Sequence, residues 1–409
     1  MKLEIQIEQL TRDLALLATF SDDPAPAVTR VVFSVQDLRA RKFVKDRCVE
    51  AGLAVREDAV GNTFARWAGA EPGLPAVATG SHIDAIPNAG AYDGTVGVLG
   101  GLEAIRALQR SGFRPRRSIE LIVFTAEEPT RFGIGCFGSR MLAGLLEGSA
   151  LRDRDGKTLD AWRTEAGFSG DRSRVPLPPG HYHAFLELHI EQGPMLEQRG
   201  IPLGVVTAIA APASLRLWIE GEGGHAGALL MPDRHDAFCA AAEIVLAVES
   251  AAHSTGVVDT VGTVGVCDVF PGAVNSVPSR VRLEVDVRDT DLMRRDGVLA
   301  RIDQACGEVS ARRGVTVRTE VVNRDQPAVC DEGVVEALAR AATAHGLAFQ
   351  KMVSRAYHDT LFLSRIAPSA MLFIPCRGGV SHRPDEYAAP EAIDGGVLVL
   401  AEALGELAS

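Results

Sequence analysis

Several short apolar runs in this chain end abruptly in side chains that can bind metals or transfer protons. Each run has the length of a buried strand, and Gly or Pro soon follows, as at a strand that ends in a loop. In an open α/β sheet the carboxyl ends of parallel strands meet at one edge, where ligands usually bind. The runs and the polar residues after them are 74–78 before His82, Asp84 and Asp93; 118–125 before Glu127 and Glu128; 184–188 before His189; and 370–375 before His382.

The segment 80–101 is the centre of this pattern. It predicts a strand end, a loop, and then a helix with Leu99, Leu102, Ile105 and Leu108 at helical spacing. His82 and Asp84 are two residues apart, so on an extended backbone they share a face, and Asp84 could orient the ring of His82. Taken singly, each residue has an ordinary alternative, such as Asp93 capping the helix.

Composition restricts the function. The chain has 409 residues, 46% of them hydrophobic and 23% charged, which predicts a globular protein of two or three domains. No segment reaches the ~18 uninterrupted apolar residues of a membrane span. A formal charge of −11 argues against nucleic acid and anionic membranes as partners. Seven scattered cysteines without a C-x-x-C pair argue against disulfides and thiolate metal sites, and favour a cytoplasmic location.

The order of predicted elements changes after residue 210. Strands and helices follow in the order βαββαβ over about 110 residues, which is typical of a ferredoxin-like sheet. We therefore predict an inserted domain at 210–323, and a discontinuous catalytic domain formed by 1–209 and 324–409. Residues 146–179 are rich in charge, Gly and Pro, and predict a helix with loops.

One glycine motif suggests a different class of enzyme. Gly133, Gly135 and Gly138 spell G-x-G-x-x-G, the fingerprint of a nicotinamide-dependent oxidoreductase. An acidic loop separates the motif from its strand and would repel a pyrophosphate. A binding protein without catalytic activity is a second alternative.

The polar residues at the strand ends form a consistent ligand set without a thiolate. Imidazoles and carboxylates suit zinc, manganese, cobalt or nickel. Two metals that share one carboxylate need about five protein ligands plus one uncommitted base. The set is His82, Asp93, Glu127, Glu128, His189 and His382.

Along nearly its whole length, the chain resembles the hydantoinase/carbamoylase branch of the two-metal, aminopeptidase-like amidohydrolases. The matching motifs are Gly80-Ser-His-Ile-Asp84, Tyr92-Asp-Gly94, Glu127-Glu128, Glu187-Leu-His-Ile-Glu-Gln-Gly-Pro194, Gly224-His-Ala-Gly227 and Ser381-His-Arg-Pro-Asp-Glu-Tyr387. The resemblance implies an α/β catalytic domain with a mixed, largely parallel sheet, and a ferredoxin-like α+β lid that also forms a homodimer.

The resemblance also implies a role for each residue. His82 and His189 would hold one metal, Glu128 and His382 the other, and Asp93 would bridge them. The two divalent ions are expected to be Mn²⁺, with Zn²⁺, Co²⁺ or Ni²⁺ as alternatives. The general base would be Glu127. His225 would stabilise the oxyanion, and the substrate-binding residues would be Gln192, Asn275 and Arg288.

Two departures from the usual carbamoylase sequence bear on the substrate. The chain reads Ser354-Arg-Ala-Tyr-His-Asp-Thr360 and Ala228-Leu-Leu-Met-Pro232 where many carbamoylases differ. Both resemble the family members that hydrolyse ureidoglycolate in purine ureide breakdown. We therefore expect a small anionic ureido substrate, with Tyr357 and His358 in its pocket. The alternatives are N-carbamoyl-L-amino acids and allantoate.

Overall fold

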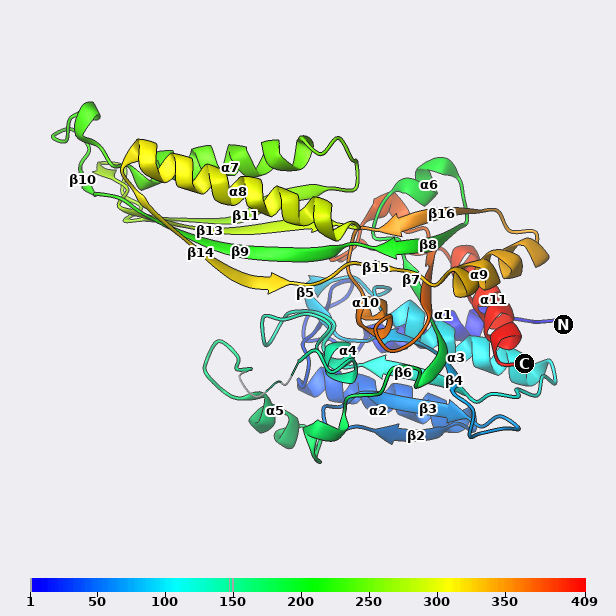
Figure 1. Cartoon of the computed structure of the whole chain (residues 1–409). Helices are drawn as coiled ribbons and strands as arrows, with labels where there is room; N and C mark the ends of the chain where they lie inside the picture. Colours follow the sequence, from blue (N-terminus) through cyan, green and yellow to red (C-terminus); the bar gives the residue numbers. More distant parts are fainter. Residues whose placement is uncertain (1, 147, 149–150) are drawn as a thin grey trace. The chain divides into compact units, whose positions relative to one another are not determined.

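The computed structural model describes residues 2–146, 148 and 151–409, which divide into two compact units. The larger unit contains Met1–Thr207, Cys330–Ser354 and His358–Ser409. The smaller unit contains Ala208–Val329 and, in addition, Arg355–Tyr357. The sequence did not predict that residues 355–357 belong to the smaller unit. Figure 1 shows both units, which are described separately below.

A mixed sheet forms the centre of the larger unit (Figure 1). Its hydrogen-bonded order is β8-β17-β7-β4-β6-β3-β2, and β16 pairs with β8. The inner strands β17, β7, β4 and β6 run parallel, and the strands beyond them are antiparallel. Both faces of the inner strands are buried, which explains their continuous apolar sequences. The bounds are β2 (Ala54–Glu57), β3 (Thr63–Trp67), β4 (Ala76–His82), β6 (Ile119–Phe124), β7 (Tyr182–Ile190), β8 (Leu203–Ile209), β16 (Phe349–Ser354) and β17 (Ser369–Ile374).

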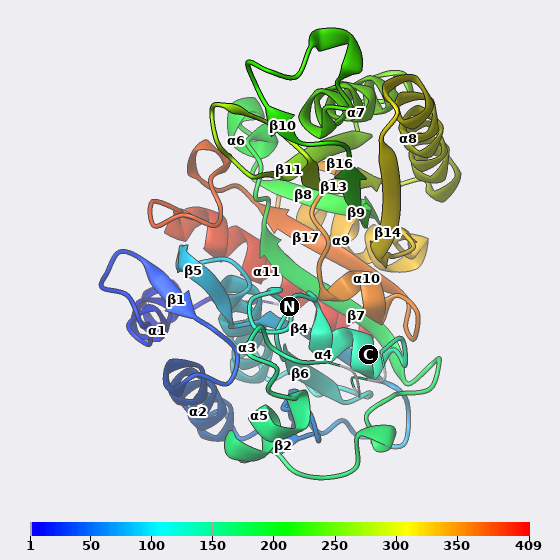
Figure 2. The same ribbon diagram turned by 90° about the vertical axis from the view of Figure 1, so that its left-hand side faces the viewer.

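Helices cover both faces of this sheet. On one face lie α3 (Thr95–Arg110) and α11 (Pro390–Leu407), which contact each other and strands β4 and β7. On the other lie α4 (Phe137–Leu142) and α10 (Asp359–Leu363). Figure 2 shows α4 and α10 in front of the sheet and the other two helices behind it. Because both faces are covered, polar side chains can gather at the carboxyl ends of the inner strands.

The remaining elements of the larger unit surround this core. Strands β1 and β5 form a separate antiparallel pair. The segment 146–179 contains a short helix and a 3-10 turn, while its residues 147 and 149–150 lie outside the described residues. The bounds are α1 (Ile7–Ala18), β1 (Val28–Arg30), α2 (Val35–Glu50), β5 (Ala85–Ala89), α5 (Leu159–Glu165), η1 (Arg172–Arg174), α6 (Met195–Arg199), α9 (Glu332–Ala344) and η3 (Arg377–Gly379).

The smaller unit is an antiparallel sheet in the order β11-β13-β9-β14, with α7 and α8 side by side on one face (Figure 1). Alternate residues of β9 and β13 are buried, as expected for strands with one covered face. This arrangement confirms the predicted ferredoxin-like pattern. The bounds are β9 (Ala211–Glu220), β10 (Gly224–His225), η2 (Met231–Asp233), α7 (Ala237–His253), β11 (Val261–Phe270), β12 (Ser276–Val277), β13 (Arg280–Asp289), α8 (Leu292–Arg313), β14 (Thr316–Arg324) and β15 (Ala328–Val329).

Two further expectations concern the chain as a whole. Among the described residues, no helix combines the length and apolar character that crossing a bilayer requires. All seven cysteines are free thiols, so none forms a disulfide.

Candidate active site

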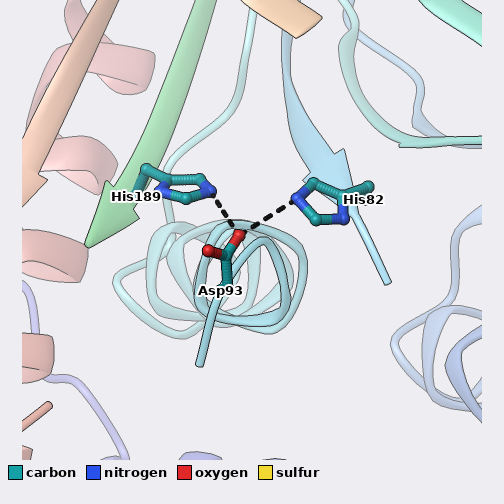
Figure 3. A group of neighbouring side chains, drawn as sticks. All are labelled: His82, Asp93 and His189. Carbon is teal, nitrogen blue, oxygen red and sulfur yellow. Dashed lines mark ion pairs between the residues drawn. The ribbon is translucent and has the colours of Figure 1, made fainter. Parts of the chain in front are cut away.

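Asp93 lies between two histidines at the sheet edge (Figure 3). Its Oδ1 atom is 3.3 Å from Nε2 of His82 and 3.3 Å from Nε2 of His189. His82 is the last residue of β4, and His189 lies near the end of the neighbouring parallel strand β7. These three side chains form one candidate metal centre, with their donor atoms within 4.8 Å of one another.

The backbone at Gly94 allows this close approach. Gly94 has φ +64°, and a Cβ there would lie only 2.4 Å from Nε2 of His82. A side chain at this position would therefore be strained and would also displace the imidazole. The glycine after Asp93 therefore allows helix α3 to begin next to the candidate metal ligands.

A second candidate metal centre shares Asp93. Nε2 of His382 lies 3.1 Å from Oε1 of Glu128 and 3.5 Å from Oδ2 of Asp93. The three side chains again have donor atoms within 4.8 Å of one another. Asp93 thus presents one oxygen to each centre, which is the arrangement of a bridging carboxylate.

Asp84 supports the turn that carries the two glutamates. Its carboxylate accepts hydrogen bonds from the main-chain amides of Glu127 at 3.2 Å and Glu128 at 3.1 Å. Ala126, just before them, has φ +53°, a strained value that the two bonds help to hold. The predicted contact with His82 is longer, at 3.6 Å from Nδ1. Asp84 therefore positions Glu127 and Glu128 more directly than the ring of His82.

The imidazoles have the tautomer that metal ligation requires. Nδ1 of His82 donates to the carbonyl oxygen of Asp84 at 3.0 Å, and Nδ1 of His189 donates to that of Ile190 at 2.9 Å. In the neutral form each ring then keeps the lone pair of Nε2 on the side of Asp93, and at His189 this nitrogen also accepts the main-chain amide of Gly94 at 3.1 Å. The donor set and its orientation fit two divalent cations.

The charges at the site also favour cations. Burial alone would lower the pKa of His82, but the carboxylates of Glu127 and Asp84 outweigh it and raise the pKa well above its usual value. Burial is likewise outweighed at Asp93, where His189 and His82 hold the pKa well below the usual range. The hydrogen bond from His382 to Glu128 is the main cause that raises the pKa of His382 to about 9. Without cations, protons neutralise this carboxylate-rich cluster.

Glu127 is placed as an uncommitted base. Its Oε2 atom is 3.8 Å from Nε2 of His82, and its Oε1 atom accepts a weak hydrogen bond from the thiol of Cys136 at 3.3 Å. Burial chiefly raises the pKa of Glu127 well above that of an ordinary carboxyl. A carboxylate of raised basicity beside the two centres is suited to accept a proton.

Gln192 and His358 also lie in this region. Gln192 donates from Nε2 to Oδ2 of Asp93 at 2.5 Å. His358 is only 2% exposed, and its ring centroid is 4.5 Å from that of His189. His358 therefore packs against one of the predicted metal ligands, and its contact with a substrate stays a prediction.

The other predicted substrate residues lie in the smaller unit. His225 is exposed on β10, pairs across from Ser276 of β12, and accepts the Gly227 amide on Nδ1 at 3.1 Å. Asn275 immediately precedes β12. Arg288 is on β13, where Asp286 accepts its hydrogen bonds at 2.8 to 3.2 Å. Tyr357 places its ring centroid 5.7 Å from the Arg288 guanidinium carbon.

The glycine motif at 133–138 is not a nucleotide-binding loop. The amides of Cys136, Phe137 and Gly138 donate to the carbonyl oxygens of Glu127, Ala126 and Thr125 at 2.7 to 2.8 Å. These amides already bind the protein's own backbone, so they cannot hold a pyrophosphate. The motif instead packs against the turn that carries Glu127.

Two residues near the site were quoted in a motif but given no role. Ser381 donates to Oδ2 of Asp93 at 2.6 Å, and Glu386 accepts from the Asp93 amide at 3.0 Å. The only sequence signal for them is their closeness to His382 in the segment 381–387.

Comparisons with known proteins identify the family of this chain. A profile of the peptidase family M20/M25/M40 matches residues 78–406. A ureidoglycolate hydrolase from Arabidopsis thaliana is 52% identical over 416 residues, covering 99% of this chain and 87% of the relative. The solved structures of AtUAH in complex with glyoxylate and with (S)-hydroxyglycine each match with a TM-score of 0.91 and 51% identity, over 99% of this chain and 98% of theirs.

A hydantoinase/carbamoylase family amidase from Burkholderia multivorans matches with a TM-score of 0.89 and 34% identity, over 99% of this chain and 98% of that one. The profile match and these full-length likenesses together decide the family. The chain belongs to peptidase family M20/M25/M40, in its hydantoinase/carbamoylase amidase branch.

Proposed function

We propose that this protein is a two-metal amidohydrolase that cleaves the ureido C–N bond of ureidoglycolate. The observation that carries the reaction class is Asp93, whose two carboxylate oxygens face two separate histidine-containing centres. The substrate is supported by the 52% identical ureidoglycolate hydrolase and by the AtUAH complexes.

The metal ligands would be His82 and His189 at one centre, Glu128 and His382 at the other, and Asp93 between them. Bound divalent cations would lower the pKa of water and polarise the ureido carbonyl group. The set has only nitrogen and oxygen donors, which suits Mn²⁺, Zn²⁺, Co²⁺ or Ni²⁺. We favour Mn²⁺ from the family resemblance.

Glu127 would act as general base and then as general acid. It takes a proton from the attacking water and returns it to the leaving nitrogen, a role that its raised pKa supports. The C–N bond of the ureido group breaks, and ammonia leaves. The carbamate that remains loses CO₂ to give hydroxyglycine, which divides into glyoxylate and a second ammonia, so that one water is consumed overall.

Residues of the smaller unit would bind the substrate. Because Nδ1 of His225 accepts the Gly227 amide, the neutral ring carries its proton on Nε2 and can donate it to the developing oxyanion. Asn275 adds a side-chain amide nearby, because it precedes Ser276, the β12 residue that pairs with His225. Arg288 would bind the substrate carboxylate through its planar guanidinium.

The spacing along β13 supports a homodimer with shared sites. Arg280, at the start of β13, pairs with Phe270 and follows closely after β12, the strand that pairs with β10 and its His225. Arg288 is eight residues further along the strand, roughly 25 Å away. A ureido acid is too small to reach both ends, so His225 and Arg288 of one chain would serve different sites. A partner chain would supply the missing residue.

We also propose a reducing, cytoplasmic location, which the seven free thiols support.

A substrate panel tests this proposal. The Mn²⁺-loaded protein is given ureidoglycolate, N-carbamoyl-L-methionine and allantoate in turn, and ammonia release is measured with and without a chelator. We expect ureidoglycolate to have the highest kcat/KM, and chelation to abolish its turnover. Equal or faster hydrolysis of either other substrate would contradict the substrate assignment, and activity that survives complete metal removal would contradict the mechanism.

A further inference from the structure

Glu386 is a buried carboxylate that has no part in the mechanism above. It is 5% exposed. Its Oε1 atom accepts hydrogen bonds from the main-chain amides of Tyr92 at 2.8 Å and Asp93 at 3.0 Å, and its Oε2 atom accepts one from the Ser381 hydroxyl at 2.8 Å. One side chain thus joins the turn that presents Asp93 to the segment that presents His382.

The backbone at Gly90 makes room for this carboxylate. A Cβ at Gly90 would lie 2.3 Å from Cβ of Glu386 and 2.5 Å from its carboxyl carbon. Because Gly90 has no side chain, Glu386 packs directly against the turn before Asp93. Hydrogen bonds to an ionised carboxylate are stronger than neutral ones, so this contact should fix the turn well.

The hydroxyl of Ser381 has a single proton and two carboxylate acceptors. It lies 2.6 Å from Oδ2 of Asp93 and 2.8 Å from Oε2 of Glu386. Oδ2 is also the oxygen that faces His382. When a cation occupies this oxygen, the hydroxyl can donate to Glu386 instead, so that the Ser381 donor keeps an acceptor.

We propose that Glu386 is a positioning residue for the second metal centre. It holds Asp93 and the Ser381–His382 segment at a fixed separation, and it offers Ser381 an alternative acceptor when metal binds. The inference rests on the proposed two-metal site, and it extends that site to a residue that contacts neither metal nor substrate.

Metal titration of two variants tests the inference. Glu386→Gln keeps the size of the side chain but replaces one accepting oxygen by a donor, and Ser381→Ala removes the shared hydroxyl. Glu391→Gln is the control, because Glu391 is an exposed carboxylate five residues further along the chain, in the first turn of α11. The dissociation constant for Mn²⁺ is measured by calorimetry on chelator-stripped protein, with amide exchange at Tyr92 and Asp93 and the melting temperature in parallel.

We expect both variants to bind Mn²⁺ at the second metal centre about 10- to 100-fold less tightly than the control, the usual effect of removing a partner that supports a metal ligand. The Tyr92 and Asp93 amides should exchange faster in Glu386→Gln than in the control. KM for ureidoglycolate at saturating Mn²⁺ should change little. A purely structural role would lower the melting temperature and leave the Mn²⁺ affinity of the folded protein unchanged.

Mn²⁺ affinities within twofold of the control in both variants would overturn the inference. If Glu386→Gln fails to fold, the Mn²⁺ affinity of Ser381→Ala alone decides the inference. This variant leaves intact the hydrogen bonds from the Tyr92 and Asp93 amides to Glu386. A wild type that binds Mn²⁺ but does not hydrolyse ureidoglycolate would refute the proposed substrate, while the titration would still decide the role of Glu386.

Discussion

Glu127 and Glu128 are neighbours in the chain, yet their carboxylates face different histidines. Oε2 of Glu127 lies 3.8 Å from Nε2 of His82, and Oε1 of Glu128 lies 3.1 Å from Nε2 of His382. Asp84 anchors both main-chain amides, so the turn presents the two side chains in fixed directions. This difference is the basis for the proposed roles, with Glu127 as the base and Glu128 as a metal ligand.

Replacing each glutamate by glutamine should therefore have different effects. Glu127→Gln should keep both metals and lower kcat by about 10²- to 10⁴-fold, because only the proton acceptor is lost. Glu128→Gln should bind one metal less. Metal content and kcat are measured on the same samples. Loss of metal in Glu127→Gln, or a kcat close to that of the wild type, would mean that the two roles have been exchanged.

Metal removal tests the two centres directly. We expect gently purified protein to contain close to two equivalents of divalent metal, and a chelator to abolish ammonia release. Added Mn²⁺ should restore it. Elemental analysis gives the content, and turnover is assayed before and after chelation. Less than one equivalent, together with full activity after chelation, would disprove the two-metal site.

The positions of the strand ends were enough to bring the predicted metal ligands together, because these positions depend on topology alone. His82 and His189 end neighbouring parallel strands, so the apolar runs before them were enough to bring the two residues together. The ferredoxin-like sheet was equally predictable, because the element order βαββαβ is typical of it. The catalytic roles came from the family resemblance and not from spacing.

Loop conformation and long-range contacts were not predictable in this way. Asp84 and His82 share a face in an extended strand, but the chain leaves the strand at His82, and the Asp84 carboxylate turns to the amides of Glu127 and Glu128. Glu386 binds the amide of Asp93 across 293 residues of sequence, a separation that no local pattern records.

Shared active sites predict complementation between inactive variants. His225→Ala and Glu127→Gln homodimers should each be almost inactive. After subunit exchange, a heterodimer has one site with both residues intact, so activity should return to a sizeable fraction of the wild-type value. Turnover is followed after mixing, and exchange is verified with differently tagged chains. If exchange is complete and the mixture stays inactive, His225 does not act in the partner's site.

His181 should make stability depend on pH. Its pKa is lowered, chiefly by burial, and its ring packs edge-on against Tyr182 with centroids 4.7 Å apart. The folded state therefore favours the neutral ring. The stability that His181 contributes is present above the unfolded pKa of about 6.5 and is lost as the pH falls below that value. His181→Gln should lose less stability than the wild type between about pH 7.5 and pH 5.5. Urea unfolding of both metal-free proteins measures this, and parallel pH curves would contradict it.

Tyr357 offers a test of substrate choice that keeps the ring contact with Arg288. Its ring lies beside the Arg288 guanidinium, a cation–π contact that phenylalanine retains. Tyr357→Phe removes only the hydroxyl, which we expect to hydrogen-bond a polar substituent of the substrate. Sites built around such a bond reject analogues without the group by about 10⁴- to 10⁵-fold, whereas one extra methylene is discriminated only about 10- to 200-fold.

Tyr357→Phe should therefore reduce the preference for ureidoglycolate over N-carbamoyl-L-methionine, with metal content unchanged. Tyr357→Ala is the matched comparison, because it also removes the ring and should weaken carboxylate binding, which appears as a raised KM for both substrates. The ratio of kcat/KM values is measured for each variant. If the phenylalanine variant keeps the wild-type ratio, the hydroxyl does not select the substrate, and selectivity must come from other groups in the pocket.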